Sequence, residues 1–165
     1  MRPALIESDA AGRRTRLGAA TAACLMWIAV LVTGCGGAPV PADLSPHGGD
    51  ACAFCRMAVS NPRTAGQIVV PGEEPRFFDD IGCLRDHLRD QPLTEGAQAY
   101  VADHRSGGWV PADRAVFARV SRIETPMGSH LIAWADESSR AQDASSQGER
   151  VPADVVLARQ AGGPR

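Results

Sequence analysis

The chain has 165 residues, with 17 arginines, no lysine and 19 acidic residues, and its formal net charge is −2. No basic patch stands out along it, which argues against nucleic acid as a partner. If the start of the chain is a signal, about 130 residues remain, enough for one domain of ordinary size.

The first 34 residues are typical of a bacterial lipoprotein signal. Arg13, Arg14 and Arg16 form a positive start, and the apolar residues 17–32 are too few and too rich in alanine for a good membrane span. Leu-Val-Thr-Gly-Cys then resembles a lipobox, in which the cysteine, here Cys35, becomes the lipidated first residue. An ordinary signal with an incidental cysteine is the alternative, and both Sec and twin-arginine export remain open.

Glycine, proline and alanine dominate residues 35–50, a composition typical of a flexible tether between a lipid and a folded body. We expect the folded domain over residues 51–158 and a disordered tail over residues 159–165.

The first part of this domain, about residues 64–104, carries signals for two strands, a helix and a third strand. Strands are expected at 67–70, 76–78 and 98–101. Asp79 and Asp80 supply N-cap character for a helix that ends near Pro92. Apolar residues recur on one face of that helix at Ile81, Leu84 and Leu88.

The second part, about residues 115–158, repeats this order. Strands are expected at 116–123 and 131–134, and a weak helix at 138–146 after Asp136. A last strand is expected at 151–157, broken by Pro152. Residues 106–111 between the two parts are expected to be a loop with Trp109 as a buried anchor. The sequence thus predicts an α+β fold of two small ββαβ units in tandem.

Cysteine counting limits the chemistry. Cys24 leaves with the signal and Cys35 is expected to carry lipid, so Cys52, Cys55 and Cys83 remain in the domain. An odd number of cysteines in an exported protein indicates at least one free thiol, or a thiol held by a metal. We expect Cys83 to be a small buried residue near the start of the helix.

The segment Cys-Ala-Phe-Cys-Arg-Met at residues 52–57 concentrates soft donors. Thiolate and thioether sulfur together favour Cu(I) over harder ions. On an extended segment, Cys55 and Met57 would present both sulfurs on one side. A dithiol redox centre and half of a zinc site are the alternatives. The first lacks a helix directly after the Cys52–Cys55 pair, and the second lacks another ligand pair in the sequence.

A second group of donors lies in Thr-Pro-Met-Gly-Ser-His at residues 125–130. Met127 and His130 can both bind copper, and a Pro-Met-Gly turn is a poor place to bury apolar area. His104 is expected in a solvated loop. The sequence shows no nucleophile elbow and no phosphate loop, and helix capping explains Asp79 and Asp80 better than catalysis does, so no enzyme is predicted.

Several of these motifs, in this order, resemble the NosL family of nitrous oxide reductase accessory lipoproteins. The resemblance rests on the lipobox at Cys35, Cys52-x-x-Cys55-x-Met57, the run from Phe78 to Cys83, Tyr100-Val101-x-Asp103, Gly108-Trp109-Val110-x-Ala112, Pro126-Met127-Gly128 and Ala133-Trp134.

The resemblance implies a fold related to organomercurial lyase. It also implies a Cu(I) chaperone that helps to assemble the copper–sulfide centre of nitrous oxide reductase. Its copper ligands would include Cys55 and Met57, with Met127 as a further candidate. Arg56 departs from the family pattern, because glycine is common at this position.

We therefore expect a lipid-anchored Cu(I)-binding chaperone that faces the periplasm, with Cys55, Met57 and Met127 as main ligands and Cys52 and His130 as auxiliary ones. Its partners would be nitrous oxide reductase or the machinery that assembles its copper sites. Gly36 after the lipidated cysteine favours the outer membrane. A thiol-disulfide oxidoreductase using Cys52 and Cys55, or a structural zinc module, are the alternative functions.

Overall fold

The computed structural model describes residues 38–45, 48–145 and 147–159. The chain divides into two units, residues 1–37 and 38–165, and all described residues belong to the second. The expected signal, the expected lipid attachment at Cys35 and nearly all of the expected tail therefore lie outside the described residues. Within the described part, no helix has the length and apolar character needed to cross a membrane.

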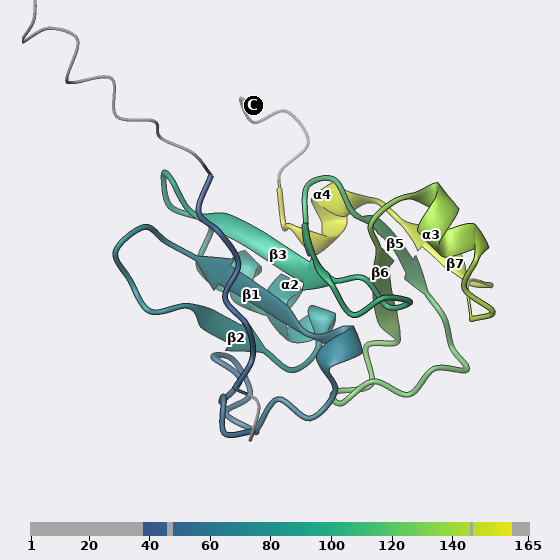
Figure 1. Ribbon diagram of the computed structural model, residues 1–165, viewed down its shortest axis with the longest axis horizontal. Helices are drawn as coiled ribbons and strands as arrows, with labels where there is room; N and C mark the ends of the chain where they lie inside the picture. The colour runs from purple at the N-terminus through teal and green to yellow at the C-terminus, as the bar shows by residue number, and fades with distance from the viewer. Residues whose placement is uncertain (1–37, 46–47, 146, 160–165) are drawn as a thin grey trace, which may run out of the picture. The chain divides into compact units, whose positions relative to one another are not determined.

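The first sheet has four antiparallel strands: β1 (Gly66–Val69), β2 (Arg76–Phe78), β3 (Gln98–Ala102) and β4 (Trp109–Pro111). Their order in the sheet is β2-β1-β3-β4. Figure 1 shows β1 between β2 and β3. The expected strands at 67–70, 76–78 and 98–101 are present with shifts of at most one residue at their ends. Strand β4 was expected to be a loop, and Trp109 in it is only half-buried.

The second sheet has three antiparallel strands: β5 (Val116–Arg119), β6 (Leu131–Trp134) and β7 (Glu149–Val151). Their order is β6-β5-β7, so the first strand in chain order lies in the middle, as β1 does between β2 and β3. The structure is thus a mixed α+β fold with two antiparallel sheets. Strand β5 is shorter than expected, because a turn closed by the Ile123 amide and the Val120 carbonyl follows it.

Helix α2 (Ile81–Asp90) connects β2 to β3 and begins as expected, with Asp80 as its N-cap. Its buried face includes Ile81, Leu84 and Leu88. Three short helices complete the fold: η2 (Pro62–Thr64, a 3-10 turn), α3 (Glu137–Ala141, capped by Asp136) and α4 (Ala153–Val156). Helix α3 is therefore shorter than the helix expected at 138–146.

The strand expected at 151–157 is wrong beyond Val151. Pro152 has a φ of −59° and directly precedes helix α4. Proline lacks the N–H that a sheet would use, and its fixed φ suits the start of a helix. Val156 and Leu157 are nevertheless buried, because α4 contacts α2 and joins the main core.

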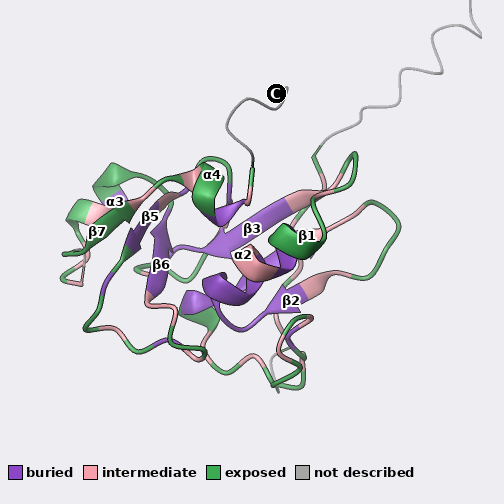
Figure 2. Cartoon of the chain, turned by 180° about the vertical axis from the view of Figure 1, so that it is seen from behind, coloured by how far each residue is buried: buried purple, intermediate pink, exposed green. Residues whose placement is uncertain are grey.

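One core cluster includes residues of both sheets, of α2 and of α4. Strands β3, β5 and β6 are buried along much of their length (Figure 2). The sheets also meet through a parallel bridge between Asp103 and Ala133, where the His104 amide donates to the Ala133 carbonyl over 2.8 Å. Because the sheets share a core, turns far apart in the sequence converge at the start of α2.

Part of the expected tether is held on the first sheet. The Ala42 amide and carbonyl both bond to the side-chain amide of buried Gln67, over 2.9 Å each. The Tyr100 hydroxyl also donates to the Pro39 carbonyl. Pro39 and Ala42 of the expected tether thus contact the first sheet, and its flexibility stays a prediction.

Candidate metal centre

Three cysteines meet where the segment 52–57 approaches the start of helix α2. The sulfur atoms of Cys52, Cys55 and Cys83 all lie within 4.8 Å of one another, and all three are free thiols. Three sulfurs that each lie about 2.3 Å from one ion are about 4.0 Å apart in a trigonal arrangement. Shortening of the sulfur–sulfur distances by less than about 1 Å would therefore let the three sulfurs bind a single ion.

The segment from Cys52 to Met57 is a tight turn. The Cys52 amide donates to the Met57 carbonyl over 2.8 Å, and the Arg56 amide donates to the Cys52 carbonyl over 3.0 Å. Arg56 has a φ of +68°, in the left-handed region that glycine adopts most easily. The segment is therefore not extended, contrary to the expectation from the sequence. The alternation of side chains along a strand thus gives no reason for the sulfurs of Cys55 and Met57 to lie on the same side of the backbone.

The end of strand β2 holds this turn in place. The Ala53 amide donates to the Phe77 carbonyl over 2.8 Å, and the Asp79 carboxylate accepts from the Ser60 amide over 2.7 Å. The backbone of Asp79 also forms a hydrogen bond with the sulfur of Cys52. Asp79 thus fixes both the position of the first thiol and the path of the chain that leaves the turn.

Cys83 is the site residue that the sequence analysis missed as a ligand. Its side chain is buried, as expected, but its sulfur faces the Cys52–Cys55 pair. It is the third residue of helix α2, where the helix dipole favours negative charge on sulfur. Its place in the first helical turn after the capping residue Asp80 was the one local signal for this role. In the sequence, Cys83 has no neighbouring ligand, which argued against a zinc site. In the fold, Cys83 lies beside Cys52 and Cys55, so that argument no longer holds.

The Pro-Met-Gly turn is attached to the same end of helix α2 by Asp80. One carboxylate oxygen accepts from the Gly82 amide over 2.6 Å and from the Ser129 hydroxyl. The other accepts from the Thr125 hydroxyl over 2.7 Å and from the Met127 amide over 2.9 Å. Although burial opposes it, these hydrogen bonds keep the pKa of Asp80 below its ordinary value. Asp80 therefore stays ionised and positions Met127.

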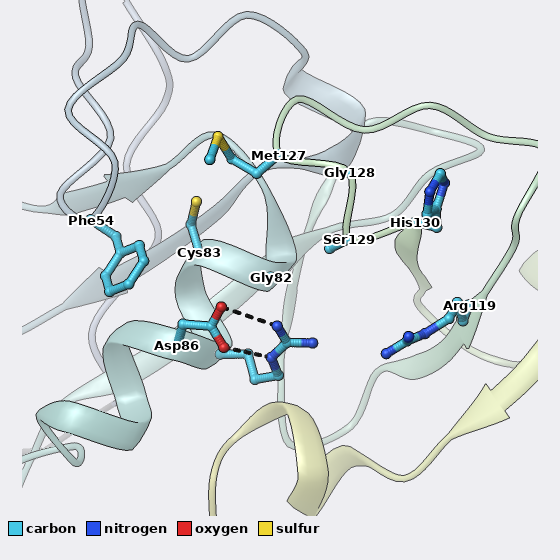
Figure 3. A pocket seen from close by; sticks show the side chains of 10 residues that line it. Phe54, Gly82, Cys83, Asp86, Arg119, Met127, Gly128, Ser129 and His130 are labelled. Atoms are coloured by element: carbon cyan, nitrogen blue, oxygen red, sulfur yellow. Dashed lines mark hydrogen bonds and ion pairs between the residues drawn. The ribbon is translucent and has the colours of Figure 1, made fainter.

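Met127 and Cys83 line one pocket of about 300 Å³ (Figure 3). Met57 and Met127 are 48% and 49% exposed, so both thioethers are accessible from solvent. Met57 is not among the described residues that line this pocket. The structure therefore places Met127 near Cys83 and leaves the part played by Met57 a prediction.

A family model for NosL matches residues 43–153 of the chain, which include all three clustered cysteines. The chain belongs to the NosL family. Comparison with curated proteins and with solved structures found no match. NosL proteins are accessory copper proteins rather than members of a known enzyme family, and membership links this chain to the assembly of nitrous oxide reductase and to the cell envelope.

The three thiols of this NosL protein differ in acidity. Burial raises the pKa of the Cys52 thiol, but hydrogen bonds from the backbone of Asp79, Cys55 and Phe54 outweigh it and leave the pKa lowered. Burial raises the pKa of the Cys55 and Cys83 thiols, and neighbouring thiolate charge raises both further. Cys52 is therefore the first of the three to ionise, which gives it a larger part than the sequence indicated.

His130 also lines the pocket beside Met127. Its Nδ1 lies 2.7 Å from the Ile123 carbonyl oxygen, which can only accept, so Nδ1 carries a proton and a metal could bind only at Nε2. His130 lies outside the three-sulfur cluster, the only group of three or more potential His, Cys, Asp or Glu ligands among the described residues. His104, expected in solvent, is instead bonded to Asp143 over 2.8 Å.

Proposed function

We propose that this NosL protein is a Cu(I)-binding metallochaperone that supplies copper for the copper–sulfide centre of nitrous oxide reductase. The observation that carries the proposal is the group of three free thiols within 4.8 Å of one another at the start of α2. Family membership supports the pathway. In this role copper is cargo, and the protein needs no catalytic turnover.

The donor set favours Cu(I) over zinc. Soft thiolates bind both ions, but a structural zinc site closes with four ligands. Among the described residues, the cluster offers three sulfurs and no fourth His, Cys, Asp or Glu within the same reach. Cu(I) accepts two or three sulfur ligands, and the neutral thioethers of Met57 and Met127 are compatible with it.

We assign the inner ligands to Cys52, Cys55 and Cys83, and keep Met57, Met127 and His130 as outer donors. Cys55 is the only half-buried thiol of the three, so it is the one that a recipient's ligand can approach first. Ligand exchange at Cys55 would then release copper without unfolding of the buried pair. The exposed methionine side chains offer intermediate soft donors on the way out.

The remaining parts of the proposal concern fold and location. The shared strand order of the two sheets supports tandem ββαβ units over about 64–104 and 115–158, related to the organomercurial lyase fold. The signal at residues 1–34 and a lipidated Cys35 would anchor the 51–158 domain to the outer membrane, facing the periplasm. Several acyl chains on one cysteine would hold it there stably.

Competition with a Cu(I) chelator under reducing conditions tests the proposal. The purified protein is expected to bind one Cu(I) per chain. Cys52→Ser, Cys55→Ser and Cys83→Ser are each expected to weaken binding at least about tenfold, because even loss of a residue that only orients a metal ligand costs about 10- to 100-fold. Ser60→Ala is the control, because Ser60 contacts Asp79 but offers no soft donor. Unchanged affinity in all three cysteine variants would refute the site.

A thiol-disulfide oxidoreductase is the second candidate, favoured by the lowered pKa of Cys52 beside Cys55. Mild oxidation would then remove two thiols, and the reduced protein would lack Cu(I) affinity. The pair lies in a turn rather than at a helix start, so it lacks the usual setting of such centres. Thiol titration before and after copper loading separates the two functions.

A further inference from the structure

The pocket beside Cys83 has two walls of different chemistry (Figure 3). Phe54, Cys83 and Met127 form an apolar wall that carries two sulfur atoms, and Arg119 and His130 lie on the opposite side. The copper site accounts for the sulfur-bearing wall and, with His130 as an outer donor, for part of the opposite side. Arg119 offers no donor atom to the ion and requires a separate explanation.

Arg119 presents an unpaired positive charge to this pocket. It is the last residue of strand β5, pairs with Leu131 in the sheet, and is an exposed residue that lines the pocket. Among the residues that the structure describes, none forms a hydrogen bond or an ion pair with its guanidinium.

The one carboxylate in the pocket is already neutralised. Asp86 accepts two hydrogen bonds from Arg85, over 2.8 and 3.0 Å, and a third from Arg89 over 3.1 Å. The lining thus holds two guanidinium groups, of Arg85 and Arg119, against one carboxylate. The Asp80 carboxylate lies behind this lining, but hydrogen bonds from Gly82, Ser129, Thr125 and Met127 engage both of its oxygens. Among the described residues, Arg119 is therefore the charged group of the lining that has no partner. An anion is therefore the ligand that its charge favours.

We propose that this pocket binds a small thiol that carries a carboxylate, and that Cu(I) reaches the cysteine cluster as a complex with such a thiol. The inference rests on the proposed copper function. The ligand's carboxylate would pair with Arg119 and its sulfur would face Cys83. About 300 Å³ is the lower end of the range for ligand pockets, which restricts the ligand to about amino-acid size.

Delivery is an exchange of ligands without a change of oxidation state. A bond forms between copper and a cysteine sulfur of the protein as the bond between copper and the carrier sulfur breaks. The proton of the incoming cysteine thiol passes to the departing carrier thiolate, and copper remains monovalent. Arg119 holds the carrier's carboxylate during this exchange, so it is a positioning residue and not a copper ligand.

Transfer rates from two carriers of similar size test the inference. Cu(I) complexes of 3-mercaptopropionate and of 2-mercaptoethanol are mixed with the purified apoprotein, and copper uptake is followed by stopped-flow absorbance of the thiolate-to-copper band. Arg119→Gln is expected to slow transfer from the carboxylate carrier about fivefold, the upper range for a partly exposed ion pair, and to leave the neutral carrier unchanged. Arg114→Gln, an exposed arginine outside the pocket, is the control and is expected to change neither rate.

A metal-free titration provides an independent readout. 3-Mercaptopropionate is expected to shift the NMR signals of the Arg119 side chain and the His130 ring in the reduced apoprotein, and 2-mercaptoethanol is not. Equal transfer rates from both carriers, or no effect of Arg119→Gln, would overturn the inference and leave the copper function standing. If the protein binds no Cu(I), the proposed copper function is wrong. If the NMR shifts are absent as well, the proposal that the pocket binds a thiol with a carboxylate is also wrong.

Discussion

The Asp80 carboxylate accepts a hydrogen bond from the backbone amide of Met127 over 2.9 Å, across 47 residues of sequence. The same carboxylate caps helix α2, in whose first turn Cys83 lies. One side chain therefore sets the position of Met127 relative to Cys83. Capping and site assembly depend on the same buried charge.

Replacement of Asp80 by alanine is expected to lower the free energy of unfolding by about 3 kcal/mol, because a helix cap and several buried hydrogen bonds are lost together. Asp136→Ala removes only the cap of α3 and is expected to cost about 1 kcal/mol. Urea unfolding of both variants gives the comparison. A cost of Asp80→Ala no larger than that of Asp136→Ala would contradict the double role.

Gly82 allows helix α2 to approach the turn at Ser129. A Cβ on Gly82 would lie 2.5 Å from the Ser129 Cβ, closer than any ordinary contact. Gly82→Ala is expected to destabilise the protein by about 2 kcal/mol through overpacking, although alanine favours helices by about 1 kcal/mol. Thermal unfolding measures the change. Adding Ser129→Gly to Gly82→Ala should recover part of the loss, and a single variant more stable than the parent would rule out the clash.

Arg56 adopts a left-handed conformation in the turn that carries Cys52 and Cys55. Arg56→Gly is expected to stabilise the protein by up to about 1 kcal/mol, because glycine adopts this φ without steric cost. Arg56→Val should destabilise it, since β-branched residues fit this region worst. Arg89→Gly, in helix α2, is the control and is expected to cost about 1 kcal/mol. Equal stabilities of Arg56→Gly and Arg56→Val would be the contrary result.

Asp103 makes stability depend on pH. Its carboxylate accepts hydrogen bonds from Ser106, from the Ala135 amide and from the Ser139 hydroxyl. Although burial opposes it, these bonds lower its pKa from 3.8 to about 2. The unfolded chain therefore binds the proton first, and the stabilisation of about 2 kcal/mol that is present above pH 4 is lost as the pH falls toward 2.

Urea unfolding at several pH values between 2 and 5 measures this dependence. Asp103→Asn is expected to be less stable at pH 5 and to show a flatter pH profile, because the titrating group is gone. Asp113→Asn, at an exposed position, is the control that should keep the parent's slope. An unchanged slope in Asp103→Asn would show that other carboxylates carry the acid sensitivity.

Most strands and the long helix could be predicted from the sequence, because their signals are local. The apolar periodicity of strands and helix and the capping aspartates act within a few residues along the chain. The strand expected after Pro152 failed for a local reason as well, since apolar residues in a short run do not distinguish a strand from a buried helical turn. Strand β4 was not predicted, because its three residues carry no clear local strand signal. It is a strand only through its pairing with β3.

The sequence by itself determined the class of chemistry: an odd number of cysteines beside methionines, in motifs resembling a copper-protein family that the family comparison then confirmed. Only the tertiary structure decided which sulfurs meet. Cys83 joins Cys52 and Cys55 because strand β2 feeds directly into α2 beside the turn 52–57, and Asp80 draws Met127 to the same helix end. These contacts depend on packing between segments that are distant in the sequence. The spacing of residues within a short motif does not determine them.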